Sequence, residues 1–143
     1  MHRALMILAL FLLAGCSLNN MPTPRATYSP VSDVSLYRRV ANIPGVTGVE
    51  LRWTNGFDNP NGYGGTVYAG RDSDDVAILD QVLAILRQGR PGADLDAIEV
   101  WRMGSYPVFP SEFGLKGQAD YTARYGPQPG TGVPPATPLI KPR

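Results

Sequence analysis

The sequence predicts a small α+β two-layer sandwich with the order helix, strand, strand, helix, strand. Apolar residues recur at spacings of three and four in segments 34–42 and 74–88, as in amphipathic helices. Segment 49–54 alternates apolar and polar residues, which is the period of a half-buried strand. Segments 66–70 and 97–103 are two further short strands. Because the first two strands follow each other as a hairpin, we expect an antiparallel sheet.

The first helix is expected to begin after Asp33 and to end near Asn42. Asp33 is a suitable N-cap, since a carboxylate can accept hydrogen bonds from the free N–H groups of the first turn. The sequence Ile43-Pro44-Gly45 then ends the helix. Its expected buried face consists of Leu36, Tyr37, Val40 and Ala41.

The connection between the first two strands is the glycine-rich stretch NGFDNPNGYGG, residues 55–65. A glycine loop that binds phosphate should follow a strand and open a helix, whereas NGYGG (61–65) leads into a strand. We therefore expect a flexible hairpin loop there. Asp58, with Asn59 and Asn61, lacks the spacing of an EF-hand loop and is interpreted as turn chemistry.

The second helix is expected over 74–88, capped by Asp72 or Ser73 and ended by Gly89. Asp72, Asp74 and Asp75 could bind calcium or act as an acid and base pair, but carboxylates in a first helical turn are ordinary. The expected inner residues are Val76, Leu79, Val82, Leu83 and Leu86, and the expected outer residues are Asp80, Gln81, Arg87 and Gln88.

The third strand is expected to direct Ile98 and Val100 toward the helices and Glu99, Trp101 and Met103 to the opposite face, beside Tyr68 or Val67. Tyr68 and Trp101 are thus a possible partner surface that could stack a sugar, a peptide or a protein. Residues 104–125 are rich in aromatic residues without a clear period, and we favour the alternative that they fold over Trp101 and complete the core.

The first fifteen residues have the organisation of an export signal. Arg3 precedes an apolar run at 4–13, whose length falls in the ~7–15 range of a secretory signal and below the about 20 residues of a membrane span. Leu13, Ala14, Gly15 and Cys16 follow, and this stretch resembles the lipobox of bacterial lipoproteins. An ordinary signal peptide with an incidental cysteine is the alternative.

The lipobox resemblance implies that the signal peptide 1–15 is cleaved before Cys16 and that the Cys16 thiol carries a diacylglycerol. A further fatty acyl chain, such as palmitate, would make the anchoring stable, because one chain alone holds a protein only weakly. The protein is then expected to be exported and lipid-anchored to the bacterial cell membrane, facing outside the cytoplasm.

Loss of the leader restricts the chemistry available. Cys16 and His2 are the only cysteine and histidine, so the mature chain has no imidazole and no free thiol. This excludes Ser-His-Asp and Cys-His catalysis and zinc sites built from His and Cys. Loss of Arg3 leaves 12 basic and 12 acidic residues, so nothing favours nucleic-acid binding. We assign no catalytic residue, metal site or cofactor.

The remaining chain divides by composition into a tether at 16–32, one α+β domain at 33–125 and a disordered Pro/Gly-rich tail at 126–143. The domain resembles a ferredoxin-like fold without a clear first strand, which could be missing or supplied by 27–31. IPGVTGVEL followed by GTVYAG and a helix is similar to heavy-metal-associated domains. That family binds metal through a Cys-x-x-Cys loop, which this sequence lacks, so no metal transport is implied.

We therefore expect a non-catalytic binding or scaffolding module of the cell envelope, with an envelope protein or glycan as its partner. The alternative is a carboxylate-dependent enzyme acting on envelope glycans, with a catalytic pair drawn from Asp58, Asp72, Asp74 and Asp75.

Overall fold

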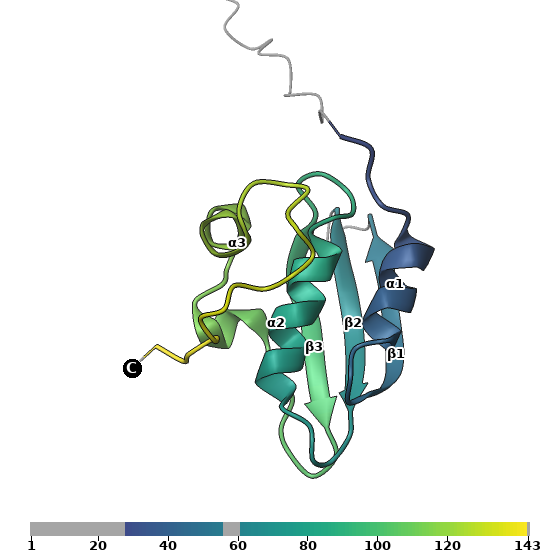
Figure 1. Ribbon diagram of the computed structural model, residues 1–143, viewed down its shortest axis with the longest axis vertical. Helices are drawn as coiled ribbons and strands as arrows, with labels where there is room; N and C mark the ends of the chain where they lie inside the picture. Colours follow the sequence, from purple (N-terminus) through teal and green to yellow (C-terminus); the bar gives the residue numbers. More distant parts are fainter. Residues whose placement is uncertain (1–27, 56–60, 143) are drawn as a thin grey trace, which may run out of the picture.

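The computed structural model describes residues 28–55 and 61–142, and it confirms the α+β class and the order of the five expected elements (Figure 1). The expected signal peptide, Cys16, most of the tether and Asp58 lie outside the described residues. The elements are α1 (Asp33–Ala41), β1 (Val46–Thr54), β2 (Gly62–Ala69), α2 (Asp75–Leu86), β3 (Asp94–Arg102), the 3-10 helix η1 (Pro110–Phe113) and α3 (Gln118–Tyr125).

The sheet has the strand order β1-β2-β3 and is mixed, not antiparallel throughout. β1 and β2 form the predicted antiparallel hairpin, whereas β3 runs parallel to β2. The parallel pair arises because α2 carries the chain back to the starting end of β2 before β3 begins. Residues 28–31 form no strand, so no first strand of a ferredoxin-like sheet separates β2 from β3.

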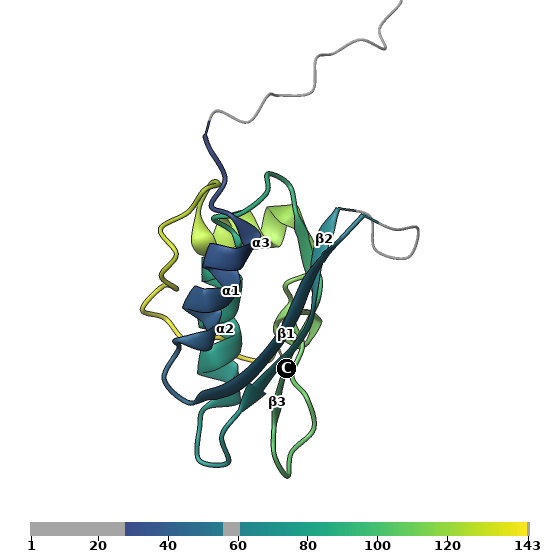
Figure 2. The same cartoon turned by 90° about the vertical axis from the view of Figure 1, so that its right-hand side faces the viewer.

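Helices α1 and α2 lie on the same side of the sheet, where they form the core with its inner face (Figure 2). α1 packs over β1 and α2 over β3. Ile98 and Val100 are fully buried there, as the alternation in 97–103 predicts. The other fully buried aliphatic side chains are Leu36, Val40, Val67, Leu79, Val82, Leu83 and Leu86.

The prediction of a flexible loop over 61–65 is wrong, because β2 already begins at Gly62. Tyr63 is fully buried, and the centroid of its ring lies 5.1 Å from that of Trp53. Gly65 has φ +124°, and a Cβ placed there would lie 2.0 Å from the carbonyl oxygen of Glu50 on β1. Glycine is thus required at this position for the close approach of two strands.

Both helices are capped by a different residue from the one predicted. The Asp74 side chain, not Asp72 or Ser73, accepts from the N–H groups of the first turn of α2 at 3.1 and 3.0 Å. Ser32 caps α1, because Asp33 is instead bound to the side chains of Tyr63 and Arg90.

Residues 104–125 complete the core on the side of β3 and α2, but they do not cover Trp101. Val108 pairs with Val100 at the outer edge of β3, and the chain then continues into η1 and α3. Trp101 stays 46% exposed, so the prediction that this segment folds over it is wrong. The buried side chains of the segment are Pro110, Phe113, Leu115, Tyr121 and Tyr125.

Residues 126–142 contain no helix or strand, as their Pro and Gly content predicts, yet they lie against the domain (Figure 1). Gln128 Nε2 donates to the carbonyl oxygen of Arg87 at 3.1 Å, and the Thr137 carbonyl accepts from Arg124 at 2.9 Å. Leu139 is buried. This corrects the prediction of a disordered tail, because these contacts make 126–142 part of the folded unit.

No helix within 28–55 and 61–142 combines the length and the apolar character that a membrane crossing requires.

Candidate functional site

The face of the sheet opposite α1 and α2, here called the outer face, is ordered by strand register into three rows. Tyr68 lies between Gly48 and Trp101 in the first row. The second row places Thr66 between Glu50 and Glu99, and the third places Gly64 between Arg52 and Ala97. Because opposite residues point to the same face of a sheet, the surface changes along the strands from an aromatic row to an acidic row and then to a row with one arginine and two small residues.

Tyr68 and Trp101, the two residues named from the sequence as a possible partner surface, are in contact. Their ring centroids are 5.8 Å apart with an angle of 62° between the planes. The indole N–H of Trp101 donates to the Ser105 carbonyl at 3.1 Å, which fixes the ring. Gly48 leaves space beside Tyr68, since a Cβ there would lie 3.2 Å from its ring. Val67 is fully buried on the other face.

The acidic row lies next to this aromatic pair. The Tyr68 hydroxyl donates to Glu50 Oε2 at 3.2 Å, and the Thr66 hydroxyl donates to Glu99 Oε1 at 2.5 Å. Loss of solvation, followed by the hydrogen bond to Glu50, raises the pKa of Tyr68 above its ordinary value. Tyr68 therefore remains a neutral donor, and each carboxylate keeps one oxygen available to accept from a ligand.

Of the carboxylates considered for catalysis in the sequence, Asp58 lies outside the described residues, and the other three have separate surroundings. Asp74 caps α2, and Asp75 forms an ion pair with Arg102 at 3.3 Å. Asp72 is exposed on the preceding turn. Within 28–55 and 61–142, no three Cys, His, Asp or Glu side chains gather as a metal site would require. This acidic run has capping and ion-pair roles in the structure.

A buried polar cluster on α2 was missed in the sequence. Asp80 is 4% exposed and accepts two hydrogen bonds from Arg124, at 2.8 and 2.5 Å, and one from the Tyr125 hydroxyl at 2.7 Å. Asp80 was predicted to face outward, but α3 covers this side of α2. The available signal was that α2 is apolar on nearly all sides, a property of helices buried all round.

Arg87 was also predicted to face outward and is instead 2% exposed. Its guanidinium donates to the Gly126 carbonyl at 2.9 Å and to the Thr122 hydroxyl at 3.2 Å. No carboxylate of the described segments forms an ion pair with it, and its Nε has no hydrogen-bond acceptor there. Burial lowers the pKa of Arg87. These contacts hold α3 and the C-terminal segment against α2, which is a structural role.

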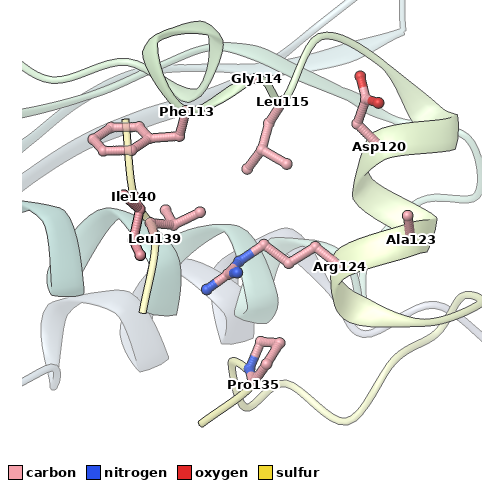
Figure 3. A pocket seen from close by; sticks show the side chains of 9 residues that line it. All are labelled: Phe113, Gly114, Leu115, Asp120, Ala123, Arg124, Pro135, Leu139 and Ile140. Atoms are coloured by element: carbon pink, nitrogen blue, oxygen red, sulfur yellow. The ribbon is translucent and has the colours of Figure 1, made fainter. Parts of the chain in front are cut away.

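The C-terminal segment, η1 and α3 enclose a shallow hollow of about 460 Å³ (Figure 3). The Arg124 guanidinium that borders it is already bound to Asp80 and to the Thr137 carbonyl. The hollow therefore offers apolar contact and little free hydrogen-bonding capacity. Its apolar lining includes Phe113, Leu115, Leu139 and Ile140.

The fold and the outer face thus define a compact α+β module with an open, half-aromatic sheet surface. Searches of protein-family models, curated proteins and solved structures found no match to this chain.

Proposed function

We propose that this chain is a lipid-anchored, non-catalytic binding module of the bacterial cell envelope, and that the outer face of its sheet binds envelope carbohydrate. The lipobox-like sequence ending at Cys16 supports the location. The exposed contact between Trp101 and Tyr68 carries the proposal for the face, because two adjoining aromatic rings on an open sheet face form a surface on which a ligand can stack.

The chemistry of the outer face favours a carbohydrate ligand. An indole held in place by its hydrogen bond to Ser105 can stack on the apolar C–H face of a sugar ring with little loss of entropy. Glu50 and Glu99 provide charged acceptors for hydroxyl groups at the next row. The third row carries the exposed Arg52 and Ala97, so the outer face continues as an open sheet surface, which suits an extended chain better than an enclosed small molecule.

Sedimentation with insoluble peptidoglycan sacculi tests the binding face. We expect the wild-type protein to sediment with sacculi and Trp101→Ala to lower its affinity about tenfold or more. Tyr106→Ala is the matched control, since Tyr106 is 91% exposed and lies outside the aromatic pair. Equal sedimentation of the wild type and Trp101→Ala would refute the role of this face.

Fatty-acid labelling of cells tests the anchor separately. The wild-type chain should incorporate labelled palmitate, and Cys16→Ser should not. Mass spectrometry should show the lipid at the amino-terminal Cys16. An unmodified Cys16 with residues 1–15 still attached would contradict the anchor, and it would leave the binding face to be judged by the sacculus experiment.

A further inference from the structure

We propose that two copies of this chain pair through the free edges of their β1 strands, antiparallel, with Leu51 of one copy opposite Leu51 of the other. This interface shares Glu50 with the outer face proposed above, but it does not include the aromatic pair of Tyr68 and Trp101.

The first observation is the open edge of β1. β1 is an outer strand of the sheet, and no strand or loop of the described segments forms backbone hydrogen bonds with its outer edge over 47–53. The strand is nine residues long and contains no proline. A long edge strand that is neither covered by another segment nor interrupted by proline is a ready template for pairing with another chain.

The second observation is a self-complementary charge pattern. The register of β1 is irregular between Val46 and Gly48 and regular from Gly48 to Thr54, so the regular part is centred on Leu51. Antiparallel pairing of this part with itself places Glu50 opposite Arg52 twice, on the outer face. Both side chains are exposed, and no carboxylate of the described segments pairs with Arg52.

Other symmetric registers are less favourable. A centre at Glu50 places two carboxylates opposite each other, and a centre at Arg52 does the same with two guanidinium groups, which is destabilising in directly opposite pairs. A shift by one residue would turn the core-facing side of one copy toward the outer face of the other. The register centred on Leu51 also joins the inner-face residues Val49 and Trp53.

The third observation concerns the flank of α1 above this edge. Arg39 is bound to Gln88, which follows α2, so the side of α1 that carries Arg39 faces α2. The opposite side, above the free edge of β1, carries Val34, Tyr37 and Ala41, and Val34 is 67% exposed. The exposed Arg38 borders this side one turn after Val34. Two such flanks would meet in the pair and remove Val34 from water.

A second copy is therefore the occupant that this edge favours. In the antiparallel pair, the strand register, the Glu50 and Arg52 charges and the Val34 side of α1 in one copy each complement the same features of the other copy. The two three-stranded sheets would become one six-stranded sheet with both outer faces on the same side. Two Trp101 side chains would then act on one ligand chain, which raises the effective affinity for a polymer.

Co-purification of two differently tagged full-length copies, expressed together and extracted in detergent, tests the pairing. Wild-type copies should co-purify. The yield should fall below about a tenth of the wild-type yield when both copies carry Glu50→Arg, or when both carry Arg52→Glu. Each of these pairs places like charges opposite each other. Glu50→Arg expressed with Arg52→Glu should restore the yield, since opposite charges face each other again. Arg71→Glu is the control for charge alone.

Each outcome decides the proposal. Restoration in the mixed pair supports pairing of two copies and shows that both variants fold. Wild-type copies that do not co-purify, or charge reversals without effect, overturn it. Loss in both variants without restoration points to a different protein on the edge and also overturns it. Trp101→Ala should leave the yield unchanged, so failure of this proposal and failure of carbohydrate binding remain distinguishable.

Discussion

Replacing Arg124 by methionine removes the cation that neutralises a carboxylate inside the protein. Asp80 is 4% exposed on α2, and the side chain of Arg124 on α3 is 14% exposed. The two are joined by a bidentate hydrogen bond at 2.8 and 2.5 Å. Methionine keeps most of the side-chain length but leaves Asp80 with the Tyr125 hydroxyl as its remaining partner. The buried negative charge is then uncompensated.

We expect Arg124→Met to lower the free energy of unfolding by about 3–5 kcal/mol, the cost of breaking a buried ion pair by removal of one partner. Small domains are stable by only about 5–15 kcal/mol, so this is a large share of the total. The double variant Asp80→Leu with Arg124→Met should recover most of the loss, because a buried ion pair contributes little more than apolar residues of similar volume.

Equilibrium urea unfolding, followed by circular dichroism, measures both variants. Arg71→Met is the control, since Arg71 is exposed and its replacement should change the stability by less than about 0.5 kcal/mol. A loss below about 1 kcal/mol for Arg124→Met would refute the reasoning, as that is the size of a surface ion pair. A double variant as unstable as the single one would refute the charge argument in particular.

Two further predictions concern local geometry and pH. Gly65→Ala should destabilise by about 3 kcal/mol or more in urea unfolding, since its Cβ would lie 2.0 Å from a backbone carbonyl. Gly104→Ala, with φ +86° and open space around it, should lose only about 1–2 kcal/mol, and equal losses would contradict the clash. Burial raises the pKa of Asp33, but hydrogen bonds from Arg90 and Tyr63 outweigh it, so the net pKa lies below its ordinary value. This carboxylate therefore stabilises the fold above about pH 4 and ceases to do so as the pH falls through its lowered pKa. Asp33→Asn should thus be less stable than wild type in urea at pH 7, with a smaller difference near pH 3, and a pH-independent difference would contradict this sign.

The parts of the fold that could be predicted are those encoded in local periodicity. The three- and four-residue spacing of apolar side chains located α1 and α2, and the alternation in β1 and β3 assigned Ile98 and Val100 to the core. The same alternation assigned Trp101 to the outer face beside Tyr68 or Val67, and the structure shows that Tyr68 is the neighbour. These features depend only on which neighbours along the chain share a face.

The parts that could not be predicted depend on contacts between distant segments. Asp80 and Arg87 carry polar side chains on what would be the exposed side of an ordinary surface helix, and they are buried by α3 and residues 126–142. The glycines of β2 have no side chains from which a strand period could be read. β3 is parallel to β2 because the crossover through α2 returns the chain to the starting end of β2, and no local pattern shows that these two strands lie side by side.

The segments that follow β3 leave the outer face of the sheet uncovered, which supports our proposal that this face binds a ligand. η1, α3 and residues 126–142 lie on the helix side of the sheet, where they bury α2 and its polar residues. The same length of chain could have covered Trp101 instead. Burial of a tryptophan and a neighbouring tyrosine would increase the stability of the fold. The aromatic pair stays open, whereas the side of α2 that carries Asp80 and Arg87 is enclosed with one buried ion pair, between Asp80 and Arg124. That allocation is expected when the outer face must remain accessible to a ligand.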